Sequence, residues 1–166
     1  WVRVIYRASG TGKETTFMNA KVMIDTNILV YAYDCLEEEK QKAAVHLLNE
    51  LITLRIAVIS TQVLGEFFVA ITRKQVQLTK EDAQERIKRF CQMWPVFEIN
   101  EMIVNEALRG VREHRLSYWD AQLWATARLN QVGLVLSEDF SHDCVVDGVR
   151  FLNPLLPGFD IYKFIR

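Results

Sequence analysis

Short β-branched runs alternate with longer stretches of helical periodicity along most of the chain. The apolar runs KVMID, IAVIS, VFEIN and LVLS predict four strands, and VRFLN predicts a fifth. The stretches between them predict helices over residues 26–33, 36–53, 62–74, 80–94, 101–116 and 117–131. Strands separated by helices pair in parallel through right-handed crossovers, with helices on both faces of the sheet. We therefore predict an α/β fold, a three-layer α/β/α sandwich with a mainly parallel sheet.

The same pattern predicts a single domain, because no linker, repeat or low-complexity segment interrupts it. We expect this domain to span residues 18–156 and to be followed by a short C-terminal tail over residues 157–166. Residues 1–17, WVRVIYRASGTGKETTF, precede Met18 and do not share the alternating pattern. The segment lacks the apolar centre of a signal peptide, so we expect a cloning remnant or an upstream extension that the fold does not use.

Composition narrows the class of protein. The chain has 166 residues, of which 50% are hydrophobic and 25% charged, as is usual for a globular domain. With 20 basic and 21 acidic residues, any contact with nucleic acid must come from a local basic patch. No apolar run approaches the ~18 residues of a membrane span. Three scattered cysteines without Cys-x-x-Cys spacing favour a reducing, cytoplasmic setting and argue against a zinc site.

Four acidic residues lie just after predicted strands or near the starts of predicted helices. Asp25 ends the first strand, and Glu66 lies early in the helix that follows the second. Asp120 is in the first turn of the helix that Ser117 begins, and Asp139 follows the strand LVLS. In a parallel sheet the carboxyl ends of the strands and the starts of the crossover helices share one edge. The topology therefore predicts that these four acids lie together.

Each acid also has a purely structural interpretation. Asp25 is a suitable helix cap, Asp139 suits a turn, Asp120 forms an S-x-x-D capping box with Ser117, and Glu66 can reach solvent. Four carboxylates at one edge, however, repel one another and raise one another's pKa unless a cation lies between them. Hard oxygen ligands select Mg²⁺ or Mn²⁺. Taken together, the acids predict a site for a divalent cation.

These residues resemble the PIN-domain family of metal-dependent ribonucleases, and among them the VapC toxins of toxin–antitoxin pairs. The resemblance covers roughly residues 18–154 and is carried by the segments IDTNILVYAYD, QVLGEFF, SYWDAQ and LSEDF. It implies that all four acids are catalytic, that three of them bind Mg²⁺ or Mn²⁺ directly, and that nearby polar side chains orient them. The implied metal ligands are Asp25, Asp120 and Asp139, with Glu66 as the fourth acid and Thr26, Asn27 and Ser137 as the orienting residues. Glu138 and Asp143 are close enough in sequence to compete with Asp139.

The resemblance further implies an RNA substrate, a cognate antitoxin and a homodimer. Five basic residues near the acids are candidates to bind RNA, although solubility alone would also account for them. They are Arg109, Arg112 and Arg115, spaced by three residues in one predicted helix, and Arg73 and Lys74 after the Glu66 helix.

Three other functions remain open. A phosphatase of the haloacid-dehalogenase type also has an Asp after its first strand, but it usually has a second acid two residues later, where this chain has Asn27. A non-catalytic PIN-like RNA-binding module would not require all four acids. A flap-type DNA nuclease shares the carboxylate chemistry, but this chain is short for the DNA-binding elements of such enzymes.

Overall fold

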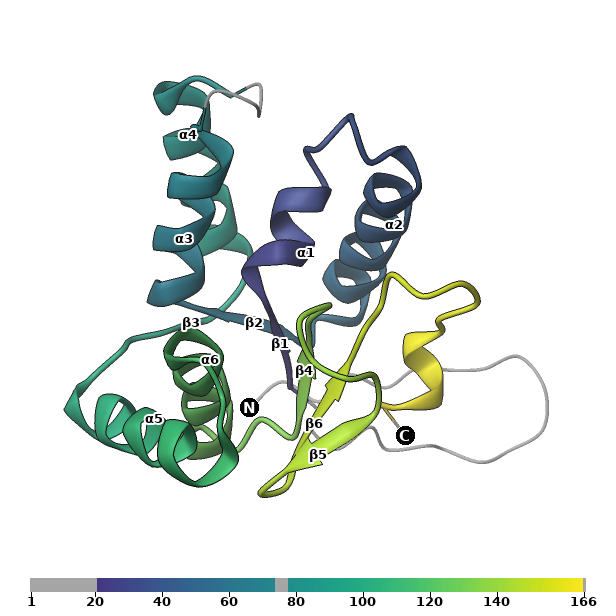
Figure 1. The fold of residues 1–166 in the computed structure, drawn as a ribbon. Helices are drawn as coiled ribbons and strands as arrows, with labels where there is room; N and C mark the ends of the chain where they lie inside the picture. Colours follow the sequence, from purple (N-terminus) through teal and green to yellow (C-terminus); the bar gives the residue numbers. More distant parts are fainter. Residues whose placement is uncertain (1–20, 74–77, 166) are drawn as a thin grey trace.

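The computed structural model describes residues 21–73 and 78–165 (Figure 1). Its strands are β1 Val22–Ile24, β2 Ala57–Ser60, β3 Val96–Phe97, β4 Leu134–Leu136, β5 Cys144–Val146 and β6 Val149–Leu152. Its helices are α1 Thr26–Tyr31, α2 Glu38–Leu54, α3 Thr61–Ile71, α4 Lys80–Met93, α5 Glu101–His114, α6 Tyr118–Leu129 and the short 3-10 helix η1 Ile161–Lys163. The expected extension over residues 1–17 lies outside the described residues.

The strands form one sheet in the order β3-β2-β1-β4-β6-β5. All neighbouring pairs are parallel except β5 and β6, which are antiparallel. This confirms the predicted α/β class with a mainly parallel sheet. β5 was not predicted, because this edge strand is only partly buried. Its turn was visible in the sequence as Asp147-Gly148, and both residues have the positive φ angles, 44° and 83°, that a tight hairpin turn requires.

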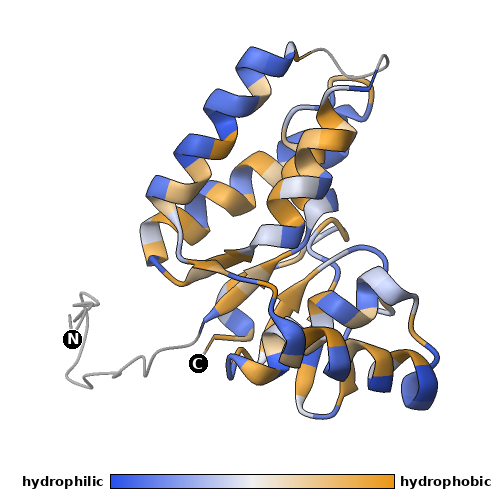
Figure 2. Cartoon of the chain, turned by 90° about the vertical axis from the view of Figure 1, so that its left-hand side faces the viewer, coloured by the Kyte–Doolittle hydropathy of each residue, from blue (hydrophilic) through white to orange (hydrophobic). Residues whose placement is uncertain are grey.

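Helices cover both faces of the sheet, as the three-layer prediction requires. Figure 1 shows α5 and α6 on one side of the sheet and α2 on the other. α2 packs against β2, and α6 packs against β4 and β6. In Figure 2 the central strands are mainly hydrophobic, and most hydrophilic residues lie on the surrounding helices. No helix in the described part of the chain is both long and apolar enough to cross a membrane.

Local capping explains why helices begin where strands end. The side chains of Asp25, Ser60 and Ser117 each accept a hydrogen bond from a backbone N–H in the first turn of α1, α3 and α6, respectively. Asp25 directly follows β1, and Ser60 is the last residue of β2. Both helices therefore start at the carboxyl edge of the sheet, which places polar side chains there.

The C-terminal segment packs against the domain. Ile161 and Ile165 are buried in the hydrophobic core. The rings of Phe159 and Phe164 stack with their centroids 5.8 Å apart. Residues 157–165 therefore contribute apolar area to the same core, which the sequence pattern alone did not reveal.

Candidate acidic active site

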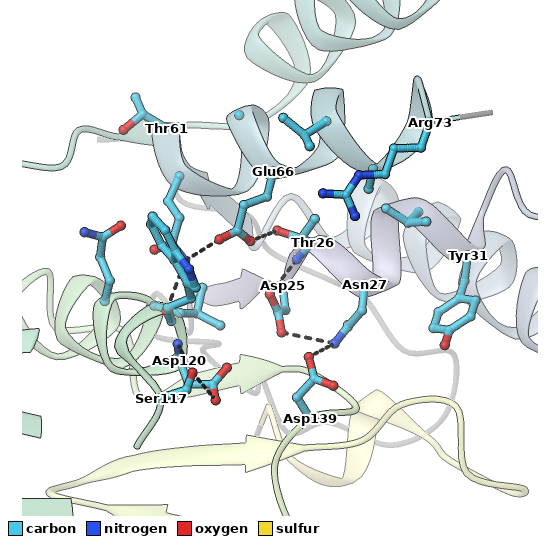
Figure 3. Close-up of a pocket in the computed structure, with 18 of the residues that line it drawn as sticks. Asp25, Thr26, Asn27, Tyr31, Thr61, Glu66, Arg73, Ser117, Asp120 and Asp139 are labelled. Carbon is cyan, nitrogen blue, oxygen red and sulfur yellow. Dashed lines mark hydrogen bonds between the residues drawn. The ribbon is translucent and has the colours of Figure 1, made fainter. Parts of the chain in front are cut away.

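The carboxyl edge of the sheet carries a groove of about 950 Å³. Its walls come from the end of β1, from α1 and α3, from the start of α6 and from the loop after β4 (Figure 3). All four predicted acids line it: Asp25, Glu66, Asp120 and Asp139. The topology thus gathers residues up to 114 positions apart in sequence at one edge, as expected, and their catalytic role stays a prediction.

Asp25 is the most enclosed of these acids, with only 7% of its surface exposed. Its Oδ1 accepts a hydrogen bond from the backbone N–H of Thr26 at 2.6 Å. Its Oδ2 accepts bonds from the Ser137 hydroxyl at 2.6 Å and from Asn27 Nδ2 at 3.1 Å. The pKa of Asp25 is nevertheless raised from 3.8 to about 7, chiefly by burial and to a smaller extent by the carboxylates of Asp139 and Glu66, against the lowering effect of the Ser137 and Thr26 bonds. This carboxylate is held in a place where its charge is costly.

Glu66 extends from α3 into the groove and is held by side chains from two helices. Thr26 Oγ1 donates to Glu66 Oε2 at 2.8 Å, and Gln62 Nε2 donates to Glu66 Oε1 at 3.1 Å. The same Gln62 amide donates to the backbone carbonyl of Trp119 at 3.0 Å, which ties α3 to α6. Sequence reasoning missed Gln62, although its position four residues before Glu66, on the same helix face, was the available signal.

Asn27 links the first and last acids. Its Nδ2 lies 3.1 Å from Asp25 Oδ2 and 3.0 Å from Asp139 Oδ2, so one amide donates to both carboxylates (Figure 3). Ser137 supports the same pair, because its hydroxyl donates to Asp25 and accepts from the backbone N–H of Asp139 at 3.1 Å. These bonds hold the carboxylates of Asp25 and Asp139 in place, and the part of Asn27 and Ser137 in catalysis stays a prediction.

Asp120 takes part in helix capping and also faces the groove. The hydroxyl of Ser117 accepts a hydrogen bond from the backbone N–H of Asp120 at 3.2 Å and donates one to Asp120 Oδ2 at 2.8 Å. The capping box is therefore present, with the hydroxyl rather than the backbone N–H of Ser117 as the donor to the carboxylate. The second oxygen of Asp120 carries no such bond within the described residues, and the side chain lines the groove.

The structure distinguishes Asp139 from its two neighbours in sequence. Glu138 turns away to accept bonds from the Tyr31 hydroxyl and from Lys40 Nζ, the latter at 2.9 Å. Asp143 pairs with Arg150 on the antiparallel hairpin. Both charges are already balanced by a basic side chain, and of these three acids only Asp139 lines the groove.

The basic residues expected to bind RNA fall into different places. Arg73 lines the groove and is exposed, with no ion-pair partner among residues 21–73 and 78–165 (Figure 3). Lys74 lies outside the described residues. Arg112 is exposed on α5 and pairs with the adjacent Glu113. Arg115 follows the end of α5 and has a left-handed backbone conformation, so it does not continue the helical face that carries Arg112. Neither lines the groove, and their RNA contacts stay predictions.

Arg109 does not line the groove, and it has several ion-pair partners. Its guanidinium is already bonded to Glu106 at 2.8 Å, to Glu113 at 2.7 Å and to Asp147 at 2.7 Å. It also lies over the ring of Trp124, 5.0 Å from the centroid. Arg109 therefore joins α5 to α6 and to the turn of the hairpin, and its contact with RNA stays a prediction.

The groove suits a hard divalent cation chemically. No three His, Cys, Asp or Glu side chains in the described ranges converge closely enough to form a ready metal cluster. No His or Cys among the described residues lines the groove, so the side-chain atoms that it offers a cation as ligands are oxygens. Asn27 Oδ1 and Gln62 Oε1 are buried acceptors without a hydrogen-bond partner among those residues. A cation with bound waters would satisfy these oxygens and offset the charge of Asp25.

Comparison with known proteins agrees with this architecture. The model of the PIN-domain family matches residues 22–145. No curated protein matches the chain. Among solved structures, a toxin–antitoxin complex from Klebsiella pneumoniae is 19% identical with a TM-score of 0.56, over 81% of this chain and 98% of that one. FitAcB from Neisseria gonorrhoeae is 18% identical with a TM-score of 0.58, over 80% and 97%. The sarcin-ricin loop cleaving toxin VapC20 of Mycobacterium tuberculosis is 16% identical with a TM-score of 0.53, over 69% and 87%.

These likenesses are to the fold, whereas the family match extends over most of the chain and includes all four acids of the groove. The chain belongs to the PIN-domain family.

Proposed function

We propose that this chain is a Mg²⁺- or Mn²⁺-dependent ribonuclease that hydrolyses RNA phosphodiester bonds, and that it is the toxin of a toxin–antitoxin pair. The observation that carries the proposal is the buried Asp25 in a groove where Thr26 links it to Glu66 and Asn27 links it to Asp139, with Asp120 in the same lining. Solved neighbours described as toxin–antitoxin complexes, and one described as a sarcin-ricin loop cleaving toxin, support it.

The residues of the groove have distinct parts in such a reaction. Asp25, Asp120 and Asp139 would hold the cation, with Glu66 beside it, and the cation would neutralise the carboxylates, attract the phosphate and activate a water for attack on phosphorus. Thr26 holds Glu66 in place through the 2.8 Å bond to Oε2.

Two further side chains complete the arrangement. Asn27 keeps Asp25 and Asp139 at a fixed separation by donating to both. It stands where a dehalogenase-type phosphatase would have its second acid, and an amide that donates to carboxylates cannot act as one. Arg73, exposed at the groove, is placed to attract an RNA phosphate.

The substitution Asp120→Asn tests the proposal directly. Asn keeps the size of the side chain and an oxygen that can accept the Ser117 hydroxyl, so we expect stability to change by at most ~1 kcal/mol. The cation site loses a charge and a strong ligand, so RNA cleavage should fall by at least about a hundredfold. Cleavage of labelled RNA with Mg²⁺ or Mn²⁺, and its loss on chelation, would be measured alongside thermal unfolding.

Asp143→Asn is the matched control, because Asp143 pairs with Arg150 outside the groove. It should cleave RNA at the parent rate. An Asp120→Asn protein that retains the parent rate would show that Asp120 serves only as part of the helix cap and that the site is misassigned.

The biological part of the proposal concerns partners. We propose that a cognate antitoxin inhibits the chain by covering the acidic groove or placing a basic side chain in it, and that the chain forms a homodimer. Expression of the chain alone should slow growth with loss of cellular RNA, and co-expression of the antitoxin should restore growth. Normal growth and intact RNA at high levels of folded protein would contradict the toxin assignment.

A further inference from the structure

Trp119 is unusual among the tryptophans that the structure describes. Trp94 and Trp124 are 4% and 0% exposed, whereas 59% of Trp119 is exposed. It lies in the lining of the acidic groove and immediately precedes Asp120. A large aromatic ring in water adds nothing to the core, and exposed aromatics of this kind are typical of binding surfaces. The exposed ring of Trp119 is therefore a candidate to contact a ligand in the groove.

The structure holds this residue in place before any ligand arrives. Its backbone carbonyl accepts Gln62 Nε2 at 3.0 Å, and that same amide positions Glu66. Its ring meets that of Tyr118 edge to face, with centroids 5.2 Å apart and planes at 74°. Gln122 in turn donates to the Tyr118 hydroxyl at 3.0 Å. Because backbone and ring are both restrained, binding against the exposed ring would require little further ordering.

The surroundings of Trp119 indicate the chemistry of its ligand. The groove residues connected to Trp119 are polar: Gln62 bonds to its carbonyl, and Asp120, the next residue, bonds to Ser117. A nucleobase has a flat π-face and a polar edge, so it can stack on the indole and keep its edge among polar groups. Stacking also provides affinity that does not depend on charge, in a groove whose carboxylates repel a polyanion.

We propose that Trp119 is the platform on which one unpaired base of the RNA stacks, next to the phosphate that Asp120 and its neighbours cleave. This inference rests on the proposed ribonuclease function and adds to it a residue that binds a base of the RNA. Bases in duplex RNA are already stacked on each other and are not available to the ring, so this contact requires an unpaired base.

The test measures RNA binding separately from cleavage. A short fluorescein-labelled single-stranded RNA of mixed sequence is titrated with Ca²⁺ in place of Mg²⁺, so that binding is observed without turnover. Trp119→Leu should bind about 5- to 150-fold more weakly, which corresponds to ~1–3 kcal/mol for one stacked base. Trp119→Phe, which keeps an aromatic ring, should recover most of the affinity. Met102 on α5 is also an exposed apolar residue, but it does not line the groove, so Met102→Ala should bind like the parent.

A base-by-base comparison identifies the stacked nucleotide. Replacing each base of the RNA in turn by an abasic sugar should weaken binding by the parent protein strongly at one position. In Trp119→Leu the same abasic change should have almost no effect, because the two changes remove the same contact and are therefore non-additive. Equal losses in the two proteins at every position would overturn the inference.

The outcomes separate this inference from the proposed function. If metal-dependent cleavage is observed but Trp119→Leu binds and cleaves single-stranded RNA like the parent, the stacking role is wrong and the ribonuclease stands. If RNA binds with the expected abasic coupling but is not cleaved with Mg²⁺ or Mn²⁺, the nuclease proposal fails and the stacking role stands. If Trp119→Leu weakens only binding of the antitoxin protein, the residue is a protein contact and the inference is overturned.

Discussion

Asp25→Asn should make the metal-free protein more stable near pH 8 and less stable near pH 4. The pKa of Asp25 is raised from 3.8 to about 7, chiefly because burial removes the carboxylate from water. The folded protein therefore holds this proton more tightly than the unfolded chain does. As the pH rises from about 4 to about 7, the unfolded chain loses the proton first, so the free energy of unfolding falls, and above about 7 the penalty is complete and constant.

The size of this penalty follows from the difference in pKa. About three pH units at 1.36 kcal/mol each correspond to ~4 kcal/mol, an upper estimate, at pH 8. Asparagine carries no charge and removes the penalty. In the parent, Asn27 Nδ2 donates a hydrogen bond to Asp25 Oδ2. In the variant the NH₂ group of the new asparagine would face this donor, so the bond is lost at a cost of ~1–3 kcal/mol. We expect a net gain of ~1–3 kcal/mol at pH 8, and a net loss near pH 4, where the charge penalty has almost vanished.

Urea unfolding of both proteins at several pH values, with a chelator present, measures this directly. The difference in free energy of unfolding between variant and parent should change by ~3–4 kcal/mol between about pH 4 and pH 8. Asp143→Asn is the control: its pKa is lowered by Arg150, so any pH dependence should be small and of opposite sign. Added Mg²⁺ at pH 8 should stabilise the parent and not Asp25→Asn. A difference between the Asp25 proteins that is independent of pH would refute the reasoning.

Two further predictions concern packing and charge. Gly110→Ala should destabilise the fold by ~1–2 kcal/mol in thermal or urea unfolding, because a Cβ there would lie 2.8 Å from the ring of Trp124. Gly65 lies in a helix with open space around it, so Gly65→Ala should be neutral or slightly stabilising. An equal effect at both glycines would contradict the packing argument. Lys40→Met should cost ~0.5–1 kcal/mol at low salt and less at high salt, because it leaves Glu138 without its cation; a loss that does not depend on salt would argue against the ion pair.

Sequence reasoning located the acids of the groove because their positions follow from local signals. Buried strands are short apolar runs, and caps such as Asp25 and Ser117 mark where the next helix begins. In a parallel α/β sheet, the ends of strands and the starts of helices share an edge by topology. Any acid at those points must therefore lie near the others, whatever the details of packing.

Sequence reasoning did not separate Asp139 from Glu138 and Asp143, which lie within five positions of one another. Glu138 pairs with Lys40, which is almost a hundred residues away in the chain, and Asp143 pairs with Arg150. A side chain that finds a basic partner turns toward it, and no local pattern records where that partner will be. The same applied to Trp119, whose exposure at the groove is set by how α3 and α6 approach each other.

The sequence by itself determined the α/β class, the order of most elements and the edge at which the four acids gather, because periodicity, capping and parallel topology act locally or follow from chain direction. Only the tertiary structure decided that Arg109 bonds to Asp147, that Ile161 and Ile165 complete the core, and that Cys144–Val146 adds an antiparallel edge. Each of these depends on a contact between segments distant in sequence. The free energy of such contacts comes from burial and charge pairing, which only the assembled fold defines.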